Sequence, residues 1–489
     1  MQICLKPLRT AFCLLPNYFS NTYFSICLGI IWFTMLAPGN PTPDGYRSFL
    51  LAKSGTIDTW FSLPYGVVFF LLTLGGKTII PLIIVQSTLL YWSLRRLLSI
   101  CLEEKSINKV MSLVSLTPIF WIFAFTLYRD VLFCAGIFLM LSSSFTKTTL
   151  NATMNIGWRR AIFFIGITIL LNMRQNAIIW VISFLFVAYL SKYFSKIRKL
   201  NLMPIAIQIP LSLSILTISY YAENTLPVTR DNGLDVVKHI LFADLKCLTY
   251  NGEITLDVSL DLYGKPAKNI FITSENSGCS TIDKVYEGDL LDADKDKETR
   301  EILSLWAKEF ANSPLKIISI HMQRIWILFP QYHIPPFEDY ELSIQILPNP
   351  PKAYLEPSVF LSVYDLNEGD LTDRGDRTLY LIAQGYGAVF NKMAFLFGNP
   401  FLLFILYLIV NYILCTGATY RSLRNEKMIW VIAVTYLVTL LSMAVASPAP
   451  DARFVYALLI LEYCAILELA SKMIKQRLSS PRCVQCPRN

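Results

Sequence analysis

The sequence predicts an all-α, polytopic membrane protein with about ten spans, one re-entrant or interfacial segment and one large water-facing insert. First, 54% of the residues are apolar and only 16% are charged, whereas soluble domains carry about 25% charged residues. Second, long apolar segments recur along the chain. Third, residues 222–397 hold 26 acidic and 16 basic residues, while the rest of the chain holds 9 and 27. This composition excludes a disordered chain, collagen, a small disulfide scaffold and a soluble nucleic-acid binder, so no nucleic-acid partner is expected.

The apolar segments set the number of expected spans, because a membrane helix needs about 20 mostly apolar residues. An additional stretch, 60–74, has fifteen residues and contains Pro64 and Gly66, so its length fits either a short span or a re-entrant segment. The segments 131–146 and 159–173 are short for a span. The expected spans lie near 19–37, 79–98, 109–127, 131–146, 159–173, 176–191, 202–221, 399–416, 428–446 and 453–471.

Basic residues set the expected orientation. If 60–74 does not cross, 21 basic residues outside the insert lie on the amino-terminal side of the membrane and six on the opposite side. The positive-inside rule then predicts that both termini are cytoplasmic and that 222–397 is outside. We therefore expect 60–74 to lie in the outer leaflet. Lys6 and Arg9 precede the first apolar run without a clear cleavage site after it, which predicts an uncleaved signal anchor.

The spans divide the chain into four expected parts. These are an amino-terminal transmembrane module at 1–221 with a first outer loop at 38–78, an extracytoplasmic domain at 222–397, a carboxy-terminal transmembrane module at 398–471 and a cytoplasmic tail at 472–489. The insert is long enough for its own core and is expected to be α/β or helix-plus-loop. Within it, 283–310 is expected to be partly helical, 314–329 an amphipathic surface helix and 330–357 a loop.

Charged residues beside or inside the spans are the candidates for chemistry, because burying charge in a bilayer is costly. A carboxylate can act as general base on a hydroxyl, and arginine holds phosphate through its planar fork. An alternative for each residue is a helix anchor or a local ion pair, and Asp130 in particular also suits the cap of a helix beginning at Val131. The candidates on the outer side are Asp44, Asp58, Arg129, Asp130, Arg174, His321, Arg324, Asp451 and Arg453.

Metal and disulfide signals are weaker. Asp292 to Asp296 resembles the opening of a calcium loop but lacks its glycine and its final glutamate, so we expect a solvated acidic face there. Cys247 and Cys279 are the only cysteines in the insert, and the bacterial outer compartment is oxidising. A bridge between them would stabilise the insert by roughly 3–4 kcal/mol. Two buried free thiols are the alternative.

The order of short motifs resembles a known family. The first outer loop contains Asp44, Tyr46, Gly55, Asp58 and Pro64; Arg95 and Arg96 end a later span; Leu-Tyr-Arg-Asp closes at Asp130; and Arg174-Gln-Asn follows. This layout resembles the GT-C superfamily of integral membrane glycosyltransferases. More narrowly, it is similar to the serotype-specific glucosyltransferases that decorate bacterial O-antigen.

The resemblance implies a function and a site. It implies inverting transfer of a hexose such as glucose from a polyprenyl-phosphate-sugar donor to lipopolysaccharide O-antigen or a similar glycan, on the periplasmic side of the bacterial inner membrane. It makes Asp44 the base and Asp130 the second acidic position, while Asp58 could share or replace the role of Asp44. No Asp-x-Asp or Glu-x-Asp pair lies near Asp44, so we expect a metal-free route without a cofactor.

The remaining candidates complete this expected site at the lipid boundary. The segments 60–74 and 314–329 would line the lipid chain, and the phosphate would bind to basic side chains. Those side chains are Arg129, Arg174, His321, Arg324 and Arg453.

Two other classes stay open. An O-antigen polymerase would share the large outer loop but depend less on a first-loop carboxylate. A flippase or transporter would carry charges in mid-span and an internal repeat. No internal repeat is visible, and the main charged exceptions are Glu462 and Glu468 of the last expected span.

Overall fold

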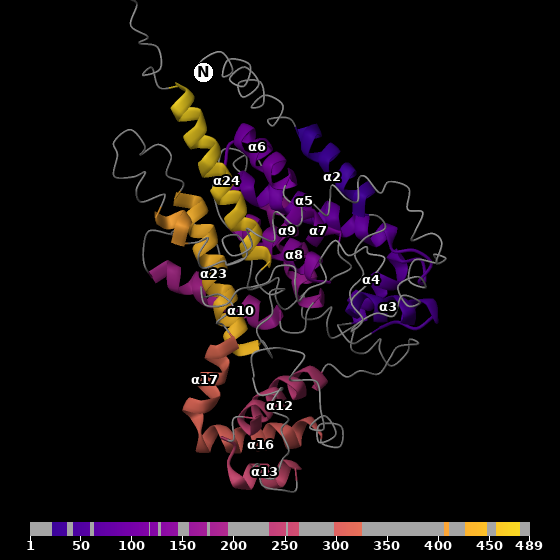
Figure 1. Cartoon of the computed structure of the whole chain (residues 1–489), viewed down its shortest axis with the longest axis vertical. Helices are drawn as coiled ribbons and strands as arrows, with labels where there is room; N and C mark the ends of the chain where they lie inside the picture. Colours follow the sequence, from indigo (N-terminus) through magenta and orange to yellow (C-terminus); the bar gives the residue numbers. More distant parts are fainter. Residues whose placement is uncertain are drawn as a thin grey trace, which may run out of the picture.

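The fold is seen in a computed structural model of the chain (Figure 1). It describes residues 22–36, 43–58, 63–116, 118–125, 129–144, 156–173, 177–193, 234–250, 253–263, 298–324, 405–409, 426–446 and 456–479. Almost all of these residues are helical and none of them forms a β-strand, which confirms the all-α class. Over the same residues, no helix combines the length and the apolarity that crossing a membrane requires.

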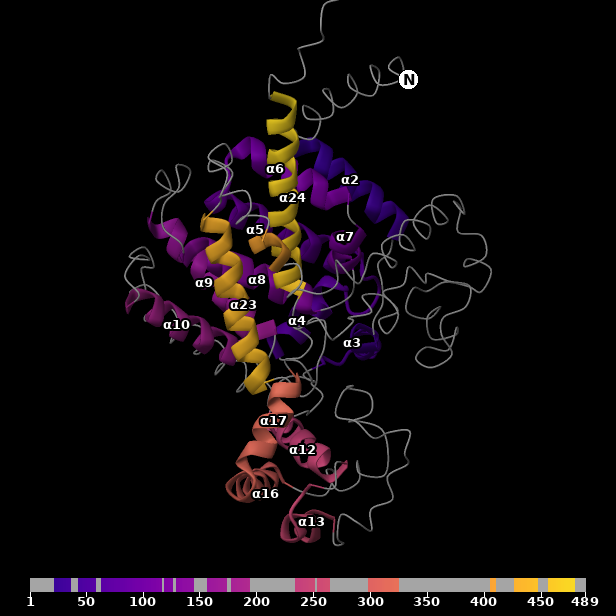
Figure 2. The ribbon, with the colours of Figure 1, turned by 60° about the vertical axis from the view of Figure 1, so that its left-hand side comes forward.

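Most of the described helices form one bundle with a shared apolar core (Figures 1 and 2). A segment at 405–409 adds the buried Tyr407 to this core. The bundle helices are α2 (Thr22–Leu36), α3 (Pro43–Lys53), α4 (Leu63–Leu72), α5 (Ile80–Cys101), α6 (Glu104–Leu116), α7 (Pro118–Ala124), α8 (Arg129–Ser144), α9 (Ile156–Met173), α10 (Ala177–Tyr193), α23 (Glu426–Ala446) and α24 (Tyr456–Ser479).

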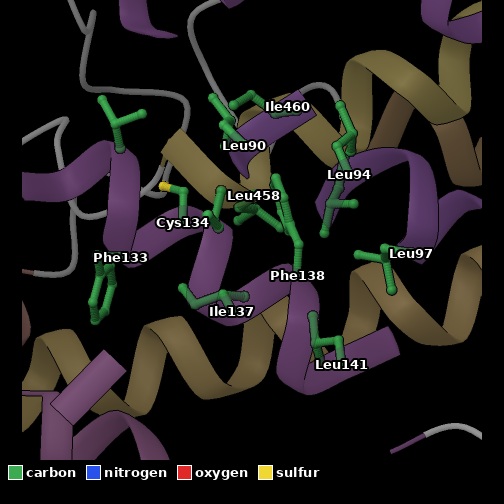
Figure 3. Close-up of a cluster of buried hydrophobic side chains, with 14 of the residues drawn as sticks. Leu90, Leu94, Leu97, Phe133, Cys134, Ile137, Phe138, Leu141, Leu458 and Ile460 are labelled. Carbon is green, nitrogen blue, oxygen red and sulfur yellow. The ribbon is translucent and has the colours of Figure 1, made fainter. Parts of the chain in front are cut away.

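Helix α8 lies at the centre of the bundle. Every residue from Asp130 to Ser144 is buried, and α8 packs against α5, α9 and α24. Figure 3 shows Phe138 of α8 among side chains of α5 and α24, including Leu94 and Leu458. A helix that is apolar on all sides must be surrounded by other helices, and the sequence of α8 is apolar around most of its circumference.

Two glycines let α8 and α9 approach closely. A β-carbon at Gly136 would lie 3.0 Å from the backbone oxygen of Gly166, and one at Gly166 would lie 2.8 Å from the amide nitrogen of Met140. Both contacts are with backbone, which cannot rotate away. At this crossing there is room for the hydrogen atom of a glycine but not for the β-carbon of any other residue.

Tryptophans tie α2 and α7 to α6. The indole Nε1 atoms of Trp32 and Trp121 both donate to the backbone oxygen of Ser115, each at 3.0 Å. Trp121 also stacks on Tyr91 of α5 and on Phe125. At the next turn, Arg95 Nη1 donates to Asn108 Oδ1 at 2.6 Å and fixes the angle between α5 and α6.

The described part of the insert is a separate group of four helices: α12 (Leu234–Tyr250), α13 (Leu256–Tyr263), α16 (Thr299–Asn312) and α17 (Pro314–Arg324). They share a core of their own, centred on Leu245, Leu248, Ile302 and Ile317. Glu309 Oε2 accepts from Thr255 N at 3.1 Å and Thr255 Oγ1 at 2.6 Å, which joins α16 to the start of α13.

Helix α17 connects this group to the bundle. It begins directly after α16 and contacts α23, and both views place it between the insert helices and the end of α23 (Figures 1 and 2). The helix expected at 314–329 is thus present from Pro314 to Arg324. The expected helical stretch 283–310 is described only from residue 298, and the expected loop 330–357 lies outside the described residues.

The described insert residues fit the helix-plus-loop expectation and not the α/β one, because they contain no strand. Helical periodicity of apolar residues explains this result: α16 and α17 are strongly amphipathic, and each turns its apolar side to the insert core.

Replacing Gly166 with valine tests the close helix crossing. The side chain would meet the backbone of Met140, so we expect a loss of about 1–3 kcal/mol in unfolding free energy. Thermal unfolding of the purified protein measures the change. Ile165→Val, at an exposed position on the same helix, is the control and should stay within about 0.5 kcal/mol. Equal midpoints for the two variants would contradict the close packing of α8 on α9.

Candidate functional site

The first candidate group lies between α3 and α4. The α3 helix ends at Lys53, and Gly55, at φ +80°, turns the chain back toward α4. Asp58 follows and is 3% exposed. Ser48 Oγ, on α3, donates a hydrogen bond of 2.7 Å to Asp58 Oδ2. Asp58 is therefore a buried carboxylate that the hydrogen bond from Ser48 keeps in place.

Gly66 explains why Asp58 is buried. A β-carbon at Gly66 would overlap the backbone oxygen of Asp58 and would come within 2.7 Å of Cγ2 of Ile57. The segment 56–58 therefore lies directly on the first turns of α4. A buried carboxylate that already accepts a hydrogen bond suits an anchor between α3 and α4, whereas a general base must reach the hydroxyl of its substrate.

Asp44, the other acid of this loop, is the second residue of α3. Its backbone is described and its side chain is not.

Arg129 and Asp130 begin helix α8. Asp130 is buried and Arg129 is partly buried. The helix starts at Arg129, two residues earlier than a helix beginning at Val131, so Asp130 lies in the first turn and does not have the N-cap position. Helix α4 packs on α5 and α9, which also flank α8. The two acids Asp58 and Asp130 are thus carried by neighbouring elements of the bundle.

The third group lies in the insert. Asp244 Oδ2, on α12, accepts a hydrogen bond of 2.7 Å from Trp306 Nε1 on α16. His321 Nε2, on α17, lies 3.0 Å from the same oxygen. Asp244 is fully buried, and the His321 side chain keeps 19% of its surface exposed. The sequence pattern indicated His321 but neither Asp244 nor Trp306. The one sequence signal for Asp244 is an acid within the apolar run Leu-Phe-Ala-Asp-Leu.

The other predicted site residues have a more limited description. Arg324 is the last residue of α17 and its side chain is not described, and Arg174 and Arg453 lie outside the described residues. Cys247 is buried and disulfide-bonded, and its partner is not among the described residues, so the pairing with Cys279 stays a prediction.

Other polar side chains of the described helices include candidate metal ligands and a surface ion pair. Across the described helices, no group of three His, Cys, Asp or Glu side chains has the arrangement of a metal site. The expected acidic face at Asp292–Asp296 lies outside these residues. On the insert surface, Lys308 Nζ donates to Asp261 Oδ2 at 3.0 Å, and this hydrogen bond raises the pKa of Lys308.

Comparison with known protein families, curated proteins and solved structures gives no match to this chain. The candidate site therefore rests on the residues themselves. The structure joins Ser48 to Asp58 and joins Trp306 and His321 through Asp244.

Replacing Ser48 with alanine tests the anchor role of Asp58. The change removes a donor to a buried carboxylate, so the unfolding free energy should fall by about 1–3 kcal/mol. Ser54→Ala is a matched control, because Ser54 Oγ is exposed and donates only to nearby groups, the backbone oxygen of Leu51 and the hydroxyl of Thr56. Thermal unfolding of the two purified variants gives the comparison. If Ser48→Ala is as stable as Ser54→Ala, Asp58 is not an anchor.

Proposed function

We propose that this protein is a multi-pass membrane glycosyltransferase of the bacterial inner membrane. It transfers a hexose such as glucose from a polyprenyl-phosphate donor to lipopolysaccharide O-antigen or a similar glycan, with inversion and without a metal. In this proposal both termini are cytoplasmic and the insert 222–397 is periplasmic. The observation that carries the proposal is a bundle with large apolar side chains exposed on its outer surface, whose helices α3 and α8 each have an aspartate as their second residue.

The outer surface of α10 illustrates the first half of this observation. Ile178, Ile182 and Phe186 are exposed at a spacing of four residues, so they form one outward stripe. On the opposite side of the helix, Trp180 and Phe184 are buried and stacked. A bundle helix in water carries polar residues on its outer face, whereas a helix that is apolar on both faces suits a lipid boundary.

Other bundle helices repeat this pattern. Large apolar side chains face outward on α2, α5, α9 and α23, including Ile30, Ile84, Ile165 and Leu437. The exposed side of α16 is more mixed: it carries Arg300, Glu301, Ser304 and Lys308 beside Leu303 and Phe310. The contrast supports a bundle in lipid and an insert in water, in agreement with the segregation of charge along the sequence.

The proposed chemistry uses the aspartates at the helix starts. Asp44 takes the proton from an acceptor hydroxyl, whose oxygen forms a bond to the anomeric carbon of the donor sugar. The bond from that carbon to the phosphate oxygen breaks, and the phosphate leaves on the polyprenyl carrier. Asp130 orients the acceptor or the base, and Asp58 holds α3 in place through Ser48.

Basic side chains at the same face would stabilise the phosphate as it leaves. Arg129 is adjacent to Asp130 at the start of α8. His321 and Arg324 lie in the last turn of α17, the helix that contacts α23. Arg174 and Arg453 complete the proposed set.

The test is Asp44→Asn and Asp130→Asn, which remove a charge while nearly preserving shape. Loss of a general base typically lowers the rate about 10²- to 10⁴-fold, and we expect a loss in that range for Asp44→Asn and a smaller one for Asp130→Asn. The measurement is the mass of surface polysaccharide from cells with equal amounts of each variant. Asp257→Asn, at an exposed insert position, is the control and should act as the wild type.

The outcomes separate the proposed classes. One added hexose per repeat with the wild type, and none with Asp44→Asn, supports the transferase. If cells without the gene instead make shorter polysaccharide chains, the protein is a polymerase and not a transferase. Wild-type turnover in both variants would show that the two aspartates are not the active site.

A further inference from the structure

The insert carries a stacked pair of aromatic rings on one face of α16. The rings of Trp306 and Phe310 have centroids 5.2 Å apart and planes at 16°. Trp306 packs against the insert core, while Phe310 remains 38% exposed. The indole of Trp306 thus packs under the phenyl ring of Phe310, and part of that ring is exposed at the surface.

Asp244 fixes this pair beside a polar group. One carboxylate oxygen of Asp244 contacts both the indole nitrogen of Trp306 and the ring nitrogen Nε2 of His321. The three side chains come from α12, α16 and α17, so the fold of the insert sets their relative positions. An aromatic surface and a partly exposed imidazole are therefore neighbours with restricted orientation.

This combination selects a class of ligand. A sugar ring presents apolar C–H groups on one face and hydroxyls at its edge, which matches a flat aromatic ring beside a hydrogen-bonding imidazole. A lipid chain has no hydroxyl for the imidazole. A nucleic-acid base also stacks, but the insert holds 26 acidic and 16 basic residues and so repels a polyanion.

We propose that Phe310, Trp306 and His321 form a carbohydrate-binding subsite for the acceptor glycan, with Asp244 as its positioning residue. The proposal rests on the proposed function for the identity of the glycan. The subsite lies on the helical group that α17 connects to α23, so a bound glycan chain is held beside the bundle. The insert then contributes to acceptor recognition and the aspartates of the bundle to chemistry.

Binding is measured on the full-length protein in detergent with lipid-free O-polysaccharide cleaved from the producing strain, by saturation-transfer NMR and by titration. Phe310→Ala removes the stacking ring. The Kd of this variant for the polysaccharide should be about tenfold higher than that of the wild type, which corresponds to ~1.4 kcal/mol. His321→Gln should weaken binding by a similar factor. Leu315→Ala is the control, since it removes an exposed apolar side chain that is not part of the stacked pair.

A transfer assay separates positioning from folding. Asp244→Asn should raise the KM for the acceptor more than the KM for the donor, whereas a merely structural loss would lower the active fraction and leave both KM values unchanged. Equal effects on both substrates would overturn the role of Asp244.

The binding result is independent of transferase activity. If the wild type binds polysaccharide and the Phe310 variant does not, the subsite stands even where no hexose is transferred, and only the proposed function fails. If Phe310→Ala binds as tightly as the wild type, or the wild type binds single-stranded oligothymidine but no polysaccharide, the subsite is overturned.

Discussion

The packing of α8 inside the bundle is the constraint on which the rest of this structure depends. Its side chains from Asp130 to Ser144 are buried, and α5, α9 and α24 surround it. The close approach at Gly136 and Gly166 brings α9 against its backbone. Because α8 begins at Arg129, the same packing fixes an arginine and an aspartate at one end of the bundle. This buried helix thus positions two of the candidate polar groups.

A second constraint separates two environments within one chain. The bundle exposes apolar stripes such as Ile178, Ile182 and Phe186, whereas the insert folds amphipathic helices around a small core of its own. Helix α17 contacts α23 and so joins the two groups. Cooperation between the carboxylates of the bundle and the proposed aromatic subsite of the insert can pass through this junction or through a bound glycan chain.

Sequence periodicity predicted individual helices better than it predicted their partners. Long apolar runs predicted α5, α23 and α24, and the spacing of apolar residues predicted α17. In contrast, Asp244 meets Trp306 and His321 across 62 and 77 residues, and no local pattern encodes such a contact. The burial of Asp58 likewise depends on the absence of a side chain at Gly66, which becomes visible only when α4 is folded against the loop.

The acidic candidates show the same limit. The positions of Asp44, Asp58 and Asp130 beside apolar segments made all three candidates, and the family resemblance favoured Asp44 as the base without excluding Asp58 from that role. The hydrogen bond from Ser48 gives Asp58 an anchoring contact, and the start of α8 places Asp130 inside the first turn. These distinctions come from tertiary packing, so residue type and spacing alone do not provide them.

The central claim is that the outer apolar faces of the bundle lie in lipid. Spin labels on cysteines replacing Ile178, Ile182 and Phe186, in protein reconstituted into vesicles, test it most directly. The account predicts high accessibility to lipid-soluble oxygen and low accessibility to a water-soluble nickel chelate at these positions, while a label replacing the buried Val181 is shielded from both. High accessibility of the three outward positions to the nickel chelate would contradict the account.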